Sequence, residues 1–242
     1  MPYGLETVHA ELYEVLADAV RVLEMHGLPY SLMCGSLLGA VRHQAIIPWD
    51  DDVDLVLPRE SYDRFEALYP GECGLGFTLD LSDTWVPRVR KLGGSAFIDL
   101  FVLDPLPSGR MRRFWKLFRL QTLQGMLKEH PQYRRFSLPK RLLLWGTHML
   151  GKLCHRERIL LAYRRIARSG LPGNHVHMSN GSFALLSTAF LPDTFTALTW
   201  APFGPLTVHI PQDAPAVLTR LYGAEYMTPP PEQERRPLHL DR

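Results

Sequence analysis

The chain has few cysteines and no long apolar run. Cys34, Cys73 and Cys154 are its three cysteines in 242 residues, and no CxxC spacing connects them. This argues against a disulfide framework and against a thiolate metal site. No stretch reaches the roughly 18 apolar residues that a membrane-spanning helix needs. The first residues include acids and lack the basic and apolar regions of a signal peptide. We therefore expect a cytoplasmic protein.

Acidic residues are scarce in one section of the chain. Residues 110–168 contain 16 Lys and Arg against only Glu129 and Glu157, which is a local charge of +14. The net charge of the whole chain is +2, so the remainder carries −12. This uneven distribution predicts two faces, an acidic one that binds metal and a basic one suited to anions.

The basic section has helical periodicity and is rich in aromatic residues. Pro131 and Pro139 interrupt it, so two or three inserted helices are the simplest interpretation. Phe114, Trp115 and Trp145 on basic amphipathic helices suit peripheral contact of residues 110–168 with a membrane, at its inner face, or with a polyanionic acceptor. An ordinary helical subdomain with solvated arginines is the alternative. Base stacking is a third option, although we expect no nucleic acid partner.

The composition is that of a soluble globular protein, with 46% hydrophobic and 21% charged residues. Hydrophobic periodicity predicts helices over 5–26, 37–42 and 58–69, and strands over 30–33, 51–57, 76–81, 86–92 and 96–101. We expect an α/β (α+β) fold, a mixed β-sheet flanked by helices. The predicted domains are a catalytic core, a basic helical insertion and a C-terminal part that completes the core and lies over the site: 1–109, 110–170 and 171–242.

Four acids, Asp50, Asp51, Asp52 and Asp54, lie within five positions of an otherwise apolar segment. Carboxylates this close repel one another unless a cation neutralises them. In a strand over 51–57, Asp52 and Asp54 share one face and Asp51 points to the other, while the direction of Asp50 stays open. Such a pair is typical of a hard-cation site for Mg²⁺, with Mn²⁺ as a substitute. The alternative is a solvated acidic turn.

Asp99 is the single acid in the apolar strand 96–101. Acids are rarely placed in such strands for packing, so we expect Asp99 to join Asp52 and Asp54 as a metal ligand or as the general base. Gly35 and Ser36 come between a strand and a helix, where free N–H groups bind phosphate. Arg88 and Arg90 share a face of the predicted hairpin, where they either clamp phosphates or face solvent.

The motifs CGSLLGAVR, IPWDDDVDLVLPR, IDLFVLDPLP and LYGAEYMTPPPEQER, in this order, resemble the LicD/fukutin family of phosphotransferases. The resemblance covers most of residues 30–105 and 205–236. It implies a nucleotidyltransferase-like fold and a metal-dependent transferase. The implied reaction moves a phospho-alcohol group, with phosphocholine as the first guess, from a CDP-linked donor to a glycan or polyol-phosphate hydroxyl and releases CMP. A lipid-linked acceptor fits the same reaction.

The resemblance carries over residue by residue. Asp52 and Asp54 match the family's metal carboxylates, and Asp99 matches the acid of its later strand. The glycine-serine turn and the C-terminal signature are matched by Gly35, Ser36, Tyr222, Gly223, Tyr226, Met227, Pro229, Pro230 and Arg235. Arg42, Arg88 or Arg90 would assist in holding a phosphate. Cys34 departs from the family, which frequently has a second glycine there.

Two rival functions remain open at the level of sequence. One is a nucleotidyltransferase that moves NMP from NTP to a small alcohol and releases pyrophosphate. The other is a non-catalytic module that binds phosphoglycans or a membrane surface, which predicts binding without dependence on Mg²⁺. The cysteine-rich metal site of some animal relatives has no counterpart here, which places the chain nearer the short bacterial members.

Overall fold

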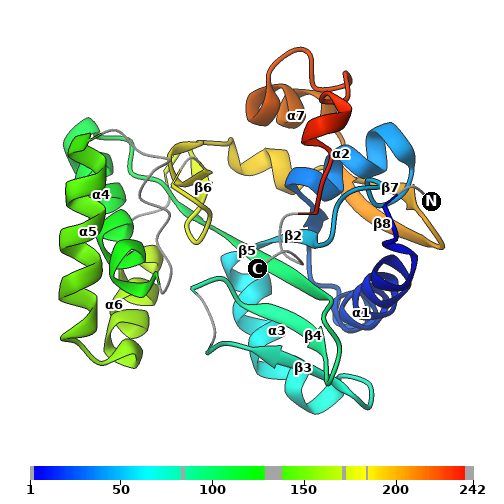
Figure 1. The fold of residues 1–242 in the computed structure, drawn as a ribbon, viewed down its shortest axis with the longest axis horizontal. Coiled ribbons are helices and arrows are strands. Elements are labelled where there is room, and N and C mark those ends of the chain that lie inside the picture. The colour runs from blue at the N-terminus through cyan, green and yellow to red at the C-terminus, as the bar shows by residue number, and fades with distance from the viewer. Residues whose placement is uncertain (1–2, 83–84, 129–137, 171–172, 184, 238–242) are drawn as a thin grey trace. The chain divides into compact units, whose positions relative to one another are not determined.

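The computed structural model describes residues 3–82, 85–128, 138–170, 173–183 and 185–237. The chain divides into two compact units (Figure 1). The first comprises Met1–Leu81, Val86–Leu103 and Leu191–Arg242, and the second comprises Ser82–Trp85 and Asp104–Phe190. The second unit contains the basic helices expected over 110–170, while the domain boundaries after residues 109 and 170 stay a prediction.

The elements of the first unit alternate between helices and strands, and β5 continues into the second unit. In chain order they are α1 (Glu6–Met25), β1 (Ser31–Leu32), α2 (Cys34–His43), β2 (Val53–Pro58), α3 (Arg59–Glu72), β3 (Phe77–Asp80), β4 (Arg88–Lys91), β5 (Phe97–Pro105), β7 (Leu198–Phe203), β8 (Leu206–Pro211) and α7 (Ala214–Tyr222).

The main sheet has the strand order β1-β2-β5-β4-β3, and β6 (Val176–Met178) also pairs with β5. The pair of β2 with β5 is parallel, whereas β1 with β2, β4 with β5 and β3 with β4 are antiparallel. Helices α1 and α3 pack against each other and against strands of this sheet. The predicted α+β class, a mixed sheet flanked by helices, is therefore confirmed.

The buried strands and the inner face of α1 form the core of the first unit. Leu12, Leu16 and Leu23 of α1 are fully buried, as are Leu55 of β2 and Leu100 of β5. The residues of β2 and β5 are apolar on both faces, as expected for parallel strands that are covered on both sides. The three acids in these strands, Asp54 of β2 and Asp99 and Asp104 of β5, therefore stand out against their surroundings.

Several predicted boundaries were wrong. Helix α3 ends at Glu72 and not at Tyr69, and β5 ends at Pro105 and not at Phe101. A further error concerns β2, next to the acidic segment. The strand begins at Val53 and not at Asp51, because its ladder with β5 starts at the pair Val53 and Ile98. Helix α2 begins at Cys34, so Gly35 and Ser36 lie in its first turn and not in a separate turn before it. Cys34, the first residue of α2, has φ of 49°, a left-handed conformation that favours glycine.

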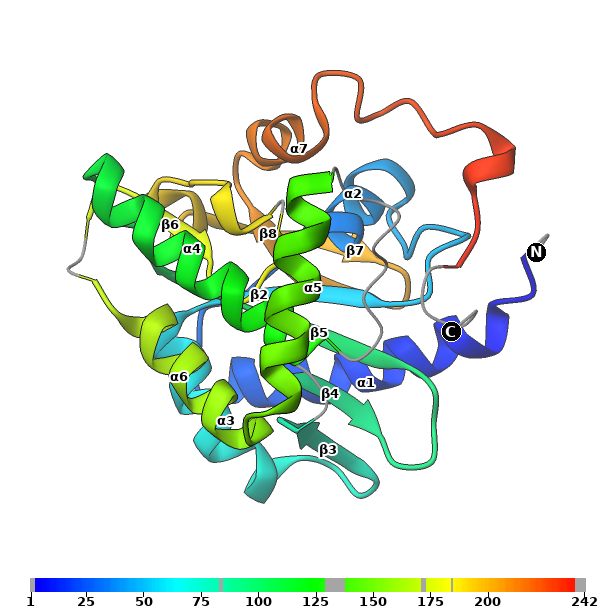
Figure 2. The same cartoon turned by 60° about the vertical axis from the view of Figure 1, so that its left-hand side comes forward.

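The second unit is built on α4 (Arg110–Leu127), α5 (Leu138–Lys152) and α6 (Arg156–Arg168) (Figure 2). Tyr163 and Leu120 belong to its apolar core. Lys116 is buried and donates hydrogen bonds to the carbonyl oxygens of Pro105, Ala167 and Ser169 at 2.7–2.8 Å. One cation of the basic section therefore holds the unit together. Within the described residues, no helix is long and apolar enough to cross a membrane.

Candidate active site

The strand register brings two of the predicted acids together. Asp54 of β2 and Asp99 of β5 are directly paired across the parallel ladder, although 45 positions separate them in sequence. Arg88 of β4 is paired with Asp99 from the other side. Its Nε donates to Asp99 Oδ1 at 2.7 Å. These three side chains form a row across three neighbouring strands.

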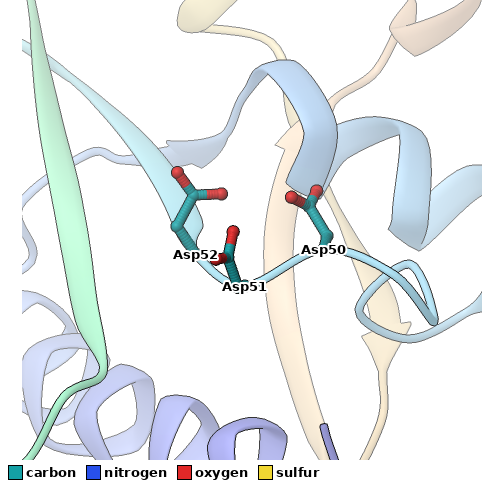
Figure 3. Close-up of side chains that lie close together, drawn as sticks. All are labelled: Asp50, Asp51 and Asp52. Carbon is teal, nitrogen blue, oxygen red and sulfur yellow. The ribbon is translucent and has the colours of Figure 1, made fainter. Parts of the chain in front are cut away.

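Asp52 completes a carboxylate group with Asp54 and Asp99. One oxygen from each of the three lies within 4.8 Å of the others, a spacing that can hold a metal ion. Asp50, Asp51 and Asp52 form a second such group on the segment that leads into β2 (Figure 3). Asp52 belongs to both groups. Carboxylate oxygens alone are a donor set for a hard cation such as Mg²⁺, so the residues fit the predicted cofactor.

Strand alternation predicted that Asp51 points away from the site, and the structure differs. Asp51 is buried and one of its oxygens lies within the second carboxylate group. The alternation rule fails because Asp51 and Asp52 precede the first paired residue of β2. Asp50, whose direction the sequence left open, has its carbonyl oxygen hydrogen-bonded to His9 Nε2 of α1 at 2.8 Å.

The crowding of acids changes their protonation. Burial is the main cause that raises the pKa of Asp54 well above its usual range, and Asp52 and Asp99 add to the effect. Burial likewise raises the pKa of Asp50 to about 8, with further contributions from Asp52 and Asp51. A bound divalent cation would relieve this repulsion and keep the carboxylates ionised.

The first turn of α2 is shaped around these acids. A Cβ atom on Gly35 would lie 2.7 Å from Asp50 Oδ2, so a side chain there would displace that carboxylate. The N–H of Gly35 is hydrogen-bonded to Asp54 and opposes the rise in the pKa of that acid. Ser36 Oγ accepts the N–H of Asp54 at 2.8 Å and fixes α2 against β2. A role of Gly35 and Ser36 in binding phosphate stays a prediction.

A pocket of about 520 Å³ opens beside the acids, entirely within the first unit. Its walls combine the acidic segment, the first helix after β1 and the C-terminal stretch. They consist of Cys34, Gly35, Leu38, Arg42, Ile47, Trp49, Asp50, Asp52, Asp54, Tyr222, Glu225, Tyr226, Thr228, Pro230, Glu234 and Arg236.

Two arginines meet on the ring of Trp49 at this pocket. The guanidinium carbon of Arg42 lies 5.7 Å from the ring centroid, and that of Arg235 lies 5.1 Å from it. Burial, and then the nearby charge of Arg235, lower the pKa of Arg42. Arg42 also donates to the carbonyl oxygen of Tyr226 at 3.4 Å. Two guanidinium groups that repel each other on one aromatic ring are suited to bind an anion between them.

The hairpin arginines share a face as predicted, and both contact acids. Arg88 pairs with Asp99, and its guanidinium carbon lies 4.0 Å from the ring centroid of Phe97. Arg90 Nη2 lies 3.4 Å from Asp80 Oδ2. The contact that the structure gives for Arg88 is therefore one that orients Asp99, and phosphate clamping by Arg88 and Arg90 stays a prediction.

Sequence reasoning missed several residues of the pocket. Trp49 and Asp50 lie in the PWDDD motif and Glu225 and Glu234 in the C-terminal motif, and Arg236 directly follows that motif. These residues could have been found because they are close in sequence to motif residues that were recognised. Residues 42–50 and 222–236 line one cavity. Hydrophobic periodicity cannot predict this contact, because it reports only on residues that are close in sequence.

Comparison with known proteins agrees with these motifs. Residues 27–91 match the family model described as LicD/FKTN/FKRP, nucleotidyltransferase domain. Lipopolysaccharide cholinephosphotransferase LicD of Haemophilus influenzae is 23% identical over 246 residues, which cover 90% of this chain and 89% of that protein. Ribitol 5-phosphate transferase FKRP of Homo sapiens is 49% identical over 63 residues, 26% of this chain and 13% of that protein.

An uncharacterized protein of Rickettsia typhi is 33% identical over 91 residues, 38% of this chain and 28% of that protein. The matched domain contains Asp52, Asp54 and both hairpin arginines, and the LicD match extends over nearly the whole chain. The match of residues 27–91 to the LicD/FKTN/FKRP family model confirms the resemblance that the motifs of the chain indicated.

Proposed function

We propose that the protein is a metal-dependent transferase that moves a phospho-alcohol group from a CDP-linked donor to a glycan or polyol-phosphate hydroxyl. The observation that carries the proposal is the joint placement of opposite charges in one pocket. Asp52 and Asp54 line the same cavity as Arg42. A diphosphate needs both a cation held by acids and direct contact with basic side chains.

Asp52, Asp54 and Asp99 are the proposed holders of Mg²⁺, with Mn²⁺ as a substitute. When bound, the ion supplies charge neutralisation for the donor's diphosphate. Arg88 keeps Asp99 oriented through its 2.7 Å contact, so the carboxylate is in place before the ion binds. Arg42 and Arg235 contribute positive charge at the Trp49 end of the pocket, where they hold a phosphate of the donor.

In the proposed reaction, the acceptor hydroxyl oxygen forms a bond to the phosphorus that carries the alcohol. The bond from that phosphorus to the oxygen of CMP breaks, and CMP leaves with the electron pair. A pocket carboxylate accepts the proton of the hydroxyl. Asp50 borders the cavity outside the Asp52, Asp54 and Asp99 group, and we assign this role to it.

Phosphocholine is the first group to test. The LicD relative, which aligns over nearly the whole chain, is named a cholinephosphotransferase, whereas FKRP is named for ribitol 5-phosphate. The donors to compare are CDP-choline, CDP-ribitol, CDP-glycerol and CDP-ethanolamine, each incubated with the protein, Mg²⁺ and a glycan acceptor. The measured product is CMP, and we expect the highest rate with CDP-choline.

Matched variants test the role of the acids. Asp54→Asn should lower CMP release by on the order of 100-fold or more, because it weakens ion binding at the centre of the site. Asp63→Asn is the control, since Asp63 lies on α3 and pairs with Arg59 at 3.2 Å. Activity of Asp54→Asn equal to that of Asp63→Asn would contradict the proposed metal site.

The runner-up function is transfer of NMP from NTP to a small alcohol, which the nucleotidyltransferase description of the matched domain supports. The leaving group distinguishes the two. Release of pyrophosphate from NTP, without release of CMP from any CDP-linked donor, would favour the second function and exclude the first.

A further inference from the structure

The second unit has an aromatic seam on the outer side of α4. Its four residues, Met111, Phe114, Trp115 and Phe118, follow the spacing i, i+3, i+4 and i+7, which places them on one face of a helix. All four are exposed, with exposed fractions from 36% to 69%. The rings of Phe114, Trp115 and Phe118 also pack against one another, with centroids 5.5–6.0 Å apart. The seam is thus an ordered apolar surface.

The same row of α4 is covered by α5 farther along the helix. Met111, Phe118 and Gly125 are seven positions apart, so they lie on one side of α4. A Cβ atom on Gly125 would lie 2.2 Å from Thr147 Oγ1 of α5, so the helices touch there. Helix α5 therefore covers the last turns of this side and leaves the aromatic seam uncovered.

Helix α5 continues the apolar surface outward. Its contacts with α4 involve Thr147 and Gly151, whereas Leu142, Trp145 and Met149 lie on the opposite side of the helix and are exposed. The aromatic seam lies on the side of α4 that carries α5, and the exposed side chains of α5 lie on the side of α5 that faces away from α4. Both sets of apolar side chains therefore point away from the core of the unit.

The charged residues of α4 and of α5 have one sign. Helix α4 contains Arg110, Arg112, Arg113 and Arg119 and no acid, and α5 contains Arg141 and Lys152 and no acid. Arg112 and Arg119 lie beside the seam on α4 and are exposed. Aromatic residues within a rim of arginines match an anionic lipid surface, where rings enter the interface and guanidinium groups meet phosphates.

We propose that the aromatic seam of α4, together with the outer side of α5, docks on an anionic membrane surface. This inference adds to the proposed function and does not depend on it, because docking requires neither a CDP-linked donor nor a metal. Among the alternatives for the basic section, the proposal favours lipid contact. An acceptor embedded in a bilayer would then be approached by a protein that already binds that surface.

Flotation with lipid vesicles tests the proposal on the chain of 242 residues. Vesicles of phosphatidylcholine alone are compared with vesicles that also contain phosphatidylglycerol. We expect the wild type to bind the anionic vesicles at least about tenfold more strongly, and to lose this preference at high salt. Equal binding to both kinds of vesicle, or binding to neither, would overturn the proposal.

Paired tryptophan variants locate the contact. Trp115→Ser and Trp145→Ser should each weaken binding by about tenfold. Trp200→Ser is the matched control, because Trp200 is 53% exposed on the first unit and Trp115 is 48% exposed on α4. Arg112→Gln with Arg119→Gln should reduce binding only to anionic vesicles. Thermal unfolding verifies that each variant is folded.

Sedimentation of the same variants distinguishes a protein occupant from lipid. A dimer of the wild type that dissociates in Trp115→Ser, with equal vesicle binding of both proteins, would assign the seam to a second copy and overturn the proposal. A monomer whose vesicle binding falls in Trp115→Ser and Trp145→Ser, but not in Trp200→Ser, would support it.

Discussion

Gly35 lies at the point where α2 meets the acidic segment, and the absence of a side chain there has a measurable consequence. In Gly35→Ala, the new Cβ would lie 2.7 Å from Asp50 Oδ2 and would push that carboxylate aside. We expect a loss of CMP release on the order of 100-fold, because small displacements of reacting groups are costly. The free energy of unfolding should change by less than about 1 kcal/mol, since only the end of a side chain moves.

Gly71→Ala on α3 is the matched control for this change. No atom lies within 4 Å of a Cβ at Gly71, so this variant should retain full activity. Unchanged activity of Gly35→Ala would mean that the position of Asp50 does not matter to the reaction. A large loss of stability in Gly35→Ala would instead mean that the glycine serves the fold.

Cys34 shows how a departure from the family can be understood from geometry. The residue has φ of 49°, a conformation that costs glycine nothing and costs other residues on the order of 1–3 kcal/mol. The surrounding β1, α2 and acidic segment hold it in place. The glycine that is frequent in the family at this position is thus explained by backbone conformation and needs no contact with a ligand.

At the scale of elements, the acidic segment that leads into β2 should make the stability of the protein depend on both pH and metal binding. Asp50 has its pKa raised from the ordinary value of 3.8 to about 8. The folded protein therefore retains a proton that the unfolded chain has released. As a result, the free energy of unfolding of the metal-free protein falls as pH rises from about 4 to about 8.

Binding of Mg²⁺ should remove much of this loss, because the ion replaces the proton as the neutralising charge. We expect the Mg²⁺-induced increase in Tm to be larger at about pH 8 than at about pH 5. Thermal unfolding with and without Mg²⁺ at both pH values measures the effect. Asp50→Asn should flatten the pH dependence of the metal-free protein. An equal increase in Tm at both pH values would be inconsistent with a metal site among these acids.

The elements themselves were largely predictable from local pattern. Helix α1, the β3 and β4 hairpin and β5 lie where hydrophobic periodicity placed them. The predicted ends of α3 and β5 were too early, and the predicted starts of β2 and α2 were wrong. There, the partner strand and a single left-handed residue determine where the elements begin, and neither is visible in the period of apolar residues.

At the scale of the first unit, the C-terminal stretch returns to cover a site built from residues 34–54. Arg235 lies over Trp49, and Tyr222 and Tyr226 line the pocket, although they are far from the acids in sequence. The C-terminal stretch thus contributes to the wall of the cavity, while the expected C-terminal domain that lies over the site stays a prediction.

Arg235→Gln tests this contribution. Loss of the guanidinium beside Arg42 should raise the KM for the CDP-linked donor by about tenfold while changing kcat less, because it weakens binding of a phosphate away from the carboxylates. Arg64→Gln is the control, since Arg64 is exposed on α3. Steady-state kinetics of CMP release provide both constants. A fall in kcat with unchanged KM would show that Arg235 acts on the reaction and not on binding.

The sequence by itself determined the acidic motif, the glycine-serine segment, the C-terminal signature and the family that these motifs resemble. These features consist of neighbouring residues, so reading along the chain is sufficient to find them. Only the tertiary structure decided that Asp54 lies opposite Asp99, that Arg88 pairs with Asp99, and that Arg42 and Arg235 meet on Trp49. The physical reason is that strand register and the return of a distant segment depend on packing between parts of the chain that local sequence does not connect.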